Sequence, residues 1–237
     1  MEKSILKVKN LNVRFGKEEV IKNLSFEVKK GEFFIVLGPN GAGKTTLFKA
    51  ILGLVPSDGE IIWQDNKIPK IGYLPERLSR DTFKNLAITV KEFFRFKEKS
   101  DKKIFSTLKA AGLKPDEILN KNPANLSSGQ FQRMLIAWSL ISEPEILFFD
   151  EPSTGIDIGG EETIYSLLDK VWKEKNLTIL LITHDLNIVY KHATNVLCLT
   201  KKGVDCSGPP ETILTPKNLR KVYGMGIKFY EHKGVKQ

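Results

Sequence analysis

GPNGAGKTT, residues Gly38 to Thr46, lies between an apolar run at residues 32–37 and a segment with helical spacing at residues 45–52. It fits the pattern G-x-x-x-x-G-K-[ST], whose glycines let a loop curl until successive N–H groups point at phosphate oxygens. The following helix adds the positive end of its dipole. We therefore expect Lys44 to reach the β- and γ-phosphates of a nucleotide and the Thr45 hydroxyl to bind Mg²⁺. A chance glycine-rich turn is the alternative, but the strand and helix on either side disfavour it.

A second apolar run, ILFFDEP at residues 146–152, ends in two acids. Asp150 is placed to hold Mg²⁺ through water, and Glu151 to polarise an attacking water. A pair of acids that merely caps a strand is the alternative interpretation. Because the chain already has a phosphate loop, the acids favour nucleotide hydrolysis over the phosphoryl transfer of a P-loop kinase, which needs no second acid aimed at water.

His184 follows the next apolar strand, at the sheet edge where the phosphate loop is also expected. A lone histidine is more often structural than functional. This position, however, would let His184 contact the γ-phosphate and the attacking water, whereas His192 and His232 have no such placement.

LSSGQFQRM, residues 126–134, is a further helix start made of small residues. Ser127 is a good N-cap, and the small Ser128 and Gly129 would permit close approach to the free N–H groups of the first turn. Taken alone, this stretch is best interpreted as an ordinary helix N-cap.

The hydrophobic pattern predicts an α/β fold. Residues 6–28 alternate with a period of two, as half-buried antiparallel strands do. Residues 89–140 are mostly helical and interrupt the strands as an inserted helical subdomain. Buried-strand runs return at residues 145–149, 178–182 and 196–199 with helices between them, which is the βαβ rhythm of a parallel sheet.

Composition and charge narrow the possible partners and the cellular location of the protein. The 237 residues carry a formal net charge of +9, but the lysines are dispersed in pairs, which favours a solvated surface over a nucleic-acid interface. No apolar run approaches the roughly 20 residues of a membrane-spanning helix, and the first ten residues lack the apolar region of a secretory signal. These features predict a cytoplasmic protein. We interpret Cys198 and Cys206 as reduced packing residues that form no metal site with the histidines.

Together, these ordered motifs resemble the ATP-binding subunits of ABC transporters, from about Ile5 to Tyr223. The resemblance implies a P-loop NTPase of ABC type, with a mainly parallel sheet, an N-terminal antiparallel β subdomain and an inserted helical subdomain. It implies one ATPase domain, 1–237. Residues 1–75 and 143–215 would form the core with the antiparallel subdomain, 76–142 the helical subdomain with the signature, and 216–237 a C-terminal tail.

The resemblance also implies roles for individual residues, with ATP and Mg²⁺ as cofactors. Glu151 and the switch histidine His184 would be catalytic, Asp157 would mark the D-loop at Ser153–Asp157, and Phe15 would stack on adenine. The phosphate loop would bind nucleotide through Gly38, Pro39, Asn40, Gly41, Ala42, Gly43, Lys44, Thr45 and Thr46. LSSGQ would be the signature that faces the ATP of a second subunit, through Ser127, Ser128, Gly129 and Gln130.

Two positions depart from the family pattern. The usual double glycine of the signature is Ser128–Gly129 here, which keeps a small side chain. The glutamine that touches Mg²⁺ and couples to the membrane subunit aligns with Glu76. A carboxylate can also bind Mg²⁺ beside Thr45 and Asp150, but it adds negative charge next to the triphosphate.

Two segments, at residues 75–94 and 196–224, resemble zinc and manganese importers. The resemblance implies an ATP-hydrolysing subunit on the inner face of the cell membrane. Its partners would be a second copy in an ATP-bound homodimer, integral membrane permease subunits and, indirectly, an extracellular solute-binding protein. Nucleic acid is not expected as a partner. A cassette for another cargo and a soluble ABC ATPase outside transport remain the alternatives.

Overall fold

The computed structural model describes residues 3–76, 78–152, 158–201 and 203–224. The expected D-loop with Asp157, and all but the first part of the expected C-terminal tail, lie outside these ranges. At the centre is a six-stranded sheet in the order β5-β6-β7-β3-β8-β9, in which only β9 runs antiparallel to its neighbour. Its strands are β3 (Phe33–Leu37), β5 (Ile71–Leu74), β6 (Ile146–Asp150), β7 (Thr178–Thr183), β8 (Asn195–Thr200) and β9 (Gly203–Gly208).

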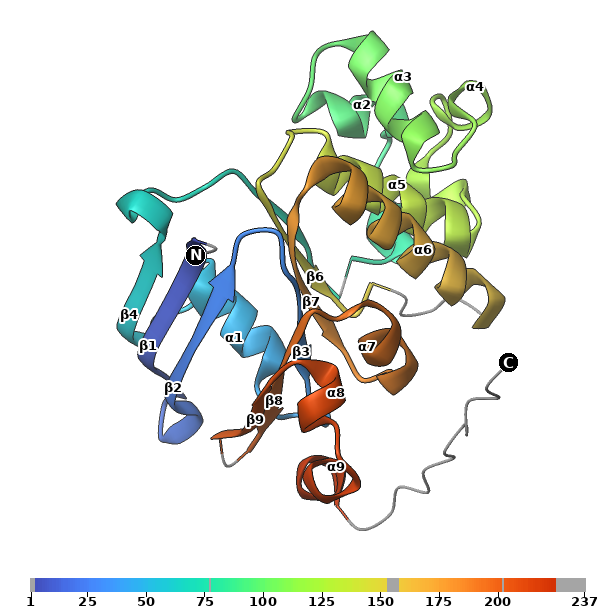
Figure 1. The fold of residues 1–237 in the computed structure, drawn as a ribbon. Helices are drawn as coiled ribbons and strands as arrows, with labels where there is room; N and C mark the ends of the chain where they lie inside the picture. Colours follow the sequence, from blue (N-terminus) through green and yellow to red (C-terminus); the bar gives the residue numbers. More distant parts are fainter. Residues whose placement is uncertain (1–2, 77, 153–157, 202, 225–237) are drawn as a thin grey trace, which may run out of the picture.

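A second, antiparallel sheet has the order β2-β1-β4. It is built from β1 (Ser4–Phe15), β2 (Glu18–Lys29) and β4 (Asp58–Trp63), and Figure 1 shows it beside the central sheet with α1 (Lys44–Ile51) between them. The other helices are α2 (Val90–Arg95), α3 (Asp101–Ala110), α4 (Pro115–Ile118), α5 (Ser128–Leu140), α6 (Ile158–Lys175), α7 (Leu186–His192), α8 (Pro210–Ile213) and α9 (Pro216–Tyr223). The predicted α/β fold with an antiparallel sheet and a helical insertion is confirmed.

Strand β3 shows why two separate cores form. All five of its residues are buried, and alternate side chains enter opposite clusters. Phe34 and Val36 join the core shared with α1 and the antiparallel sheet, whereas Phe33, Ile35 and Leu37 join the core under the remaining helices. Because strand side chains alternate between faces, a continuous apolar run is what a strand covered on both sides requires.

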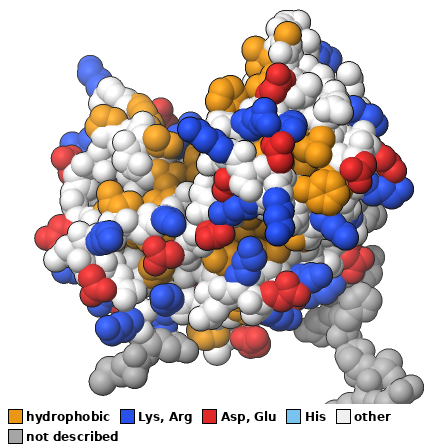
Figure 2. Space-filling view, turned by 90° about the horizontal axis from the view of Figure 1, so that it is seen from above, with side chains coloured by type: hydrophobic (Ala, Val, Ile, Leu, Met, Phe, Trp, Pro, Cys, Tyr) orange, Lys and Arg blue, Asp and Glu red, His pale blue; other side chains and the backbone are white. Residues whose placement is uncertain are grey.

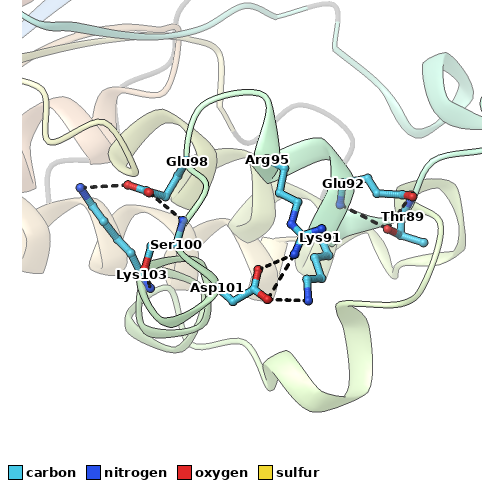
Figure 3. Close-up of polar contacts among 8 residues, drawn as sticks. All are labelled: Thr89, Lys91, Glu92, Arg95, Glu98, Ser100, Asp101 and Lys103. Atoms are coloured by element: carbon cyan, nitrogen blue, oxygen red, sulfur yellow. Dashed lines mark hydrogen bonds and ion pairs between the residues drawn. The ribbon is translucent and has the colours of Figure 1, made fainter.

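The helical part, α2 to α5, is fixed by caps and ion pairs on its surface and by aromatic packing beneath (Figure 1). Figure 3 shows Asp101 at the start of α3 meeting Lys91 at 2.7 Å and Arg95 at 3.0 Å, both from α2. Such exposed pairs contribute little each. Beneath them, Phe93 stacks on Trp138 with ring centroids 4.9 Å apart, which ties α2 to α5.

The two cysteines correct the sequence-based expectation. Cys198 and Cys206 lie directly opposite each other on antiparallel β8 and β9, with Cα atoms 4.9 Å apart, and are joined in a disulfide. The prediction that both are reduced packing residues is therefore wrong. It failed because β9 was not expected, so nothing indicated that a turn brings the two residues face to face.

None of the helices in the described ranges is both long and apolar enough to cross a bilayer.

Gly72 in β5 provides a test of the packing between the central sheet and the helical part. A Cβ added there would lie 2.5 Å from Leu147 Cδ2 and 2.6 Å from the backbone oxygen of Ser139, the penultimate residue of α5. We expect Gly72→Ala to lower the free energy of unfolding by about 2 kcal/mol, measured by urea titration. Gly129→Ala is the matched control, because a Cβ there meets nothing within 4 Å. In a helix it should be neutral or stabilise by up to about 1 kcal/mol. Equal losses in both variants would contradict this packing.

Candidate functional site

The phosphate loop joins the end of β3 to the start of α1 and depends on glycine at three positions. Gly41 and Gly43 have φ angles of 77° and 92°, in the left-handed region that disfavours other residues. A Cβ at Gly38 would collide with the backbone carbonyl of Leu199 in β8. The loop is therefore pressed against the neighbouring strand, and its curled form is imposed by the sheet.

Lys44 is buried at the first position of α1, with 6% of its surface exposed. Its ammonium donates hydrogen bonds to the carbonyl oxygens of Gly38 at 2.8 Å and Pro39 at 3.1 Å. Burial lowers the pKa of Lys44, while the negative charges of Glu151, Asp150 and Glu76 oppose that change. The cation is thus held inside the loop, next to the place where a phosphate would bind.

A pocket of about 260 Å³ opens beside the loop and brings together segments that are distant in the sequence. Its walls combine the loop and the start of α1 with the ends of three strands of the central sheet. The lining residues are Asn40, Gly41, Gly43, Lys44, Thr45, Thr46, Glu76, Asp150, Glu151 and Ile182. Three carboxylates and one ammonium therefore face one cavity, an arrangement suited to a polyanion that arrives with a divalent cation.

Asp150, the last residue of β6, is the most buried acid of the pocket, with 1% of its surface exposed. Burial raises its pKa to about 6; the nearby Thr45 hydroxyl opposes this rise, and Glu76 and Glu151 add to it. Within the described residues neither carboxylate oxygen has a partner in hydrogen-bond geometry. Burial also raises the pKa of the adjacent Tyr73 to about 12, with a contribution from Asp150.

The donor set fits Mg²⁺. This ion keeps several waters and takes only one or two carboxylates along with phosphate oxygens, so it does not need a cage made by the protein alone. The unpartnered carboxylate of Asp150 and the hydroxyl of Thr45 supply hard oxygen ligands in the pocket, with Glu76 on its rim. Across the part of the chain that the structure describes, no three His, Cys, Asp or Glu side chains are grouped as a metal site on their own.

Glu151 and His184 form a contact pair at adjoining strand ends. Nδ1 of His184 lies 2.8 Å from Oε2 of Glu151, at hydrogen-bond distance. The glutamate side chain is mostly buried and the histidine is exposed. Glu151 adopts a left-handed φ of 50°, and its backbone N–H donates to the Ile182 carbonyl of β7 at 3.1 Å. The glutamate is therefore held at the pocket wall by both backbone and side chain.

The remaining expected site residues lie elsewhere. Phe15, at the end of β1, is 49% exposed and outside the phosphate pocket. The signature residues 127–130 open α5 and do not line that pocket either. Ser127 and Gln130 form a capping box, each side chain accepting a hydrogen bond from the backbone N–H of the other. The structure thus groups the phosphate loop with Glu76, Asp150, Glu151 and His184. Phe15 and the signature residues 127–130 lie outside this group.

Sequence reasoning missed two residues of this neighbourhood. Ile182 forms part of the pocket wall, and Tyr73 places a buried hydroxyl near Asp150. Both lie in strands that end at the same sheet edge as the phosphate loop. Counting two residues back from His184 along the alternating strand could have identified Ile182. Tyr73 lies three residues before Glu76, so alternation does not relate the two.

Comparison with known proteins gives consistent findings. Residues 21–154 match a family model described as ABC transporter. The chain is 39% identical over 226 residues to an ATP-binding protein assigned to a metal transport system of Thermotoga maritima, covering 92% of this chain and 90% of that protein. A solved inward-facing transporter assigned to the metal-chelate type of ABC transporter is 27% identical, with a TM-score of 0.81, covering 93% of this chain and 88% of that one. A dimeric ABC transporter cassette is 27% identical, with a TM-score of 0.71, covering 86% and 98%.

The raised pKa of Asp150 predicts a stability change that depends on pH. An aspartate whose pKa is about 6 when folded and 3.8 ordinarily destabilises the folded protein once it is charged. The penalty is fully present above about pH 6 and disappears as the pH falls below about 3, where both states bind the proton. We expect Asp150→Asn to stabilise the nucleotide-free protein by up to about 3 kcal/mol at pH 8. Thermal unfolding should show that this gain shrinks below about pH 6 and vanishes by about pH 3, and a gain that is constant with pH would contradict the burial argument.

Proposed function

The chain belongs to the ABC transporter family and is an ATPase of that family, and we propose that it powers an importer of divalent metal ions such as zinc or manganese. The observation that supports the catalytic part best is the single pocket in which the phosphate loop meets Asp150 and Glu151, with His184 bonded to the glutamate. A nucleotide phosphate chain bound there would place its terminal phosphate among an ammonium, backbone N–H groups and a carboxylate.

Each polar residue of the pocket then has a role in hydrolysis. The N–H groups of the loop and the Lys44 ammonium bind the β- and γ-phosphates and stabilise the charge that develops on them. Glu151 orients and polarises the attacking water, and His184 fixes the glutamate from the exposed side. Thr45, Asp150 and Glu76 would hold Mg²⁺, which when bound neutralises charge on the phosphate oxygens.

The position of the signature supports a dimer as the working unit. Residues 127–130 cap α5 on the helical part, away from this chain's own phosphate pocket, and Gly129 has open space around it. Free N–H groups at a helix start suit a phosphate oxygen. Two copies would place each signature against the ATP held by the other copy's phosphate loop, with exposed Phe15 stacked on adenine.

Divalent metal as cargo is supported by likeness to two comparison proteins and by two segments of the sequence. The relative from Thermotoga maritima is assigned to metal transport, and the solved inward-facing transporter to the metal-chelate type. The segments at residues 75–94 and 196–224 resemble zinc and manganese importers. The metal would be bound by membrane permease subunits and an extracellular binding protein, with this chain on the inner face of the membrane. Another cargo, or an ATPase outside transport, is the alternative.

A hollowed face with exposed apolar side chains is suited to the permease subunits. Figure 2 shows this face, with hydrophobic side chains on the two lobes and Lys and Arg side chains across the middle. Phe96, 76% exposed, follows α2, and Ile68, 68% exposed, lies between β4 and β5.

The variant Glu151→Gln tests hydrolysis and dimerisation together. It retains shape but cannot accept a proton from water, so ATP turnover should fall by at least about a hundredfold. Gel filtration with ATP and Mg²⁺ should show a stable dimer, while Lys44→Ala, which lacks the phosphate-binding cation, should stay monomeric. A Glu151→Gln protein that is monomeric with ATP would contradict the dimer, and normal turnover by Lys44→Ala would contradict the phosphate site.

Cargo is tested by uptake in cells that lack the gene. Accumulation of zinc or manganese should drop and return with the wild-type chain but not with Lys44→Ala, expressed to the same level. Other divalent ions measured in parallel identify the cargo. Unchanged uptake of every divalent metal would overturn metal import while leaving the ATPase assignment intact.

A further inference from the structure

The backbone at Glu151 is held in a conformation that a glutamate does not adopt readily. A left-handed residue other than glycine costs about 1–3 kcal/mol and persists only where surrounding contacts enforce it. Two such contacts come from the central sheet, through the Ile182 carbonyl of β7 and the His184 ring beyond it. A third contact comes from outside the sheet, on the helical part.

That third contact is made by Gln132, in the second turn of the signature helix α5. Its side-chain amide Nε2 donates a hydrogen bond to the backbone carbonyl of Pro152, the residue directly after Glu151. Pro152 is buried and Gln132 is partly buried, so water competes weakly for this bond. We propose that Gln132 is a positioning residue that couples the signature helix to the orientation of Glu151 within the same chain.

The helix is stiff enough to carry such coupling. Its start is fixed by the capping box of Ser127 and Gln130, and Arg80 donates to the carbonyl of the preceding Leu126 at 3.1 Å. Phe131, Met134 and Leu135 bury its inner face in the larger core. A displacement of the signature is therefore transmitted along α5 to Gln132, only two residues beyond Gln130, and from there to the peptide that follows the glutamate.

The consequence rests on the proposed dimer. In that dimer the signature of one subunit binds ATP held by its partner, whereas Glu151 of the same subunit acts on ATP in the other site. Gln132 would then connect the two sites: binding of ATP at the signature of one subunit sets the glutamate that hydrolyses the second ATP. Each site would reach full activity only when the other is occupied, which is positive cooperativity between two identical sites.

Gln132→Met tests this because it removes the donor while it keeps most of the side-chain volume. We expect the maximal rate of ATP hydrolysis to fall about tenfold, the effect of losing one positioning hydrogen bond in a buried setting. The Hill coefficient for ATP should fall to about 1 from a higher wild-type value. Binding of a fluorescent ADP analogue to the monomer should change less than about twofold, because Gln132 does not touch the nucleotide.

Arg133→Ala is the matched control. Arg133 is the next residue in α5, and its guanidinium donates to the carbonyl of Gly112 at 3.3 Å, within the helical part and away from Glu151. This variant should keep the wild-type Hill coefficient and rate. A Gln132→Met protein with wild-type rate and cooperativity, or equal losses in both variants, would overturn the coupling. Wild-type protein that hydrolyses ATP without cooperativity would also overturn it, whereas failure of Glu151→Gln to dimerise would remove the proposed dimer itself.

Discussion

The burial of opposite charges at one sheet edge is the constraint on which the rest of the structure depends. Lys44 and Asp150 are 6% and 1% exposed, and both have pKa values shifted by that burial toward the neutral form. Each charge is costly to hold out of water unless it is paired. Lys44 is satisfied by loop carbonyls, while Asp150 has no hydrogen-bond partner among the described residues. The buried carboxylate of Asp150 is therefore the unsatisfied group of the site, and a cation that arrives with a nucleotide would satisfy it.

The two-core architecture makes this edge rigid enough to hold such charges. Alternate residues of β3 enter opposite cores, so the strand that carries the phosphate loop is packed on both faces. Parallel neighbours β7 and β8 fix its register along the whole length. Gly38 lies so close to the backbone of Leu199 in β8 that no side chain fits there. This contact restricts the direction in which the chain can turn from β3 into the loop. The precision of the pocket is thus a property of the sheet rather than of the loop alone.

Much of the fold could be predicted from the sequence because its signals are local. The apolar run before Gly38 corresponds to β3, and the period of two in residues 6–28 corresponds to the two strands β1 and β2. The disulfide could not be predicted, because β9 is a short edge strand with few apolar residues and its pairing with β8 depends on a turn. The left-handed Glu151 and the contact from Gln132 to Pro152 were also beyond reach. Both arise where distant segments meet, and no local pattern encodes them.

The roles assigned to the pocket residues remain predictions.

Glu76 contributes to the pKa shifts of both Asp150 and Lys44, but it is not their main cause. Glu76 raises the pKa of Asp150 and supports the charge on Lys44, but burial is the larger cause at both residues. Glu76 is exposed, so water and salt screen its effect on the interior. A glutamine there would leave most of the perturbation of Asp150 in place. The burial of Asp150 at the end of β6 is therefore the larger cause of the electrostatics of the pocket, and the exposed Glu76 makes a smaller contribution.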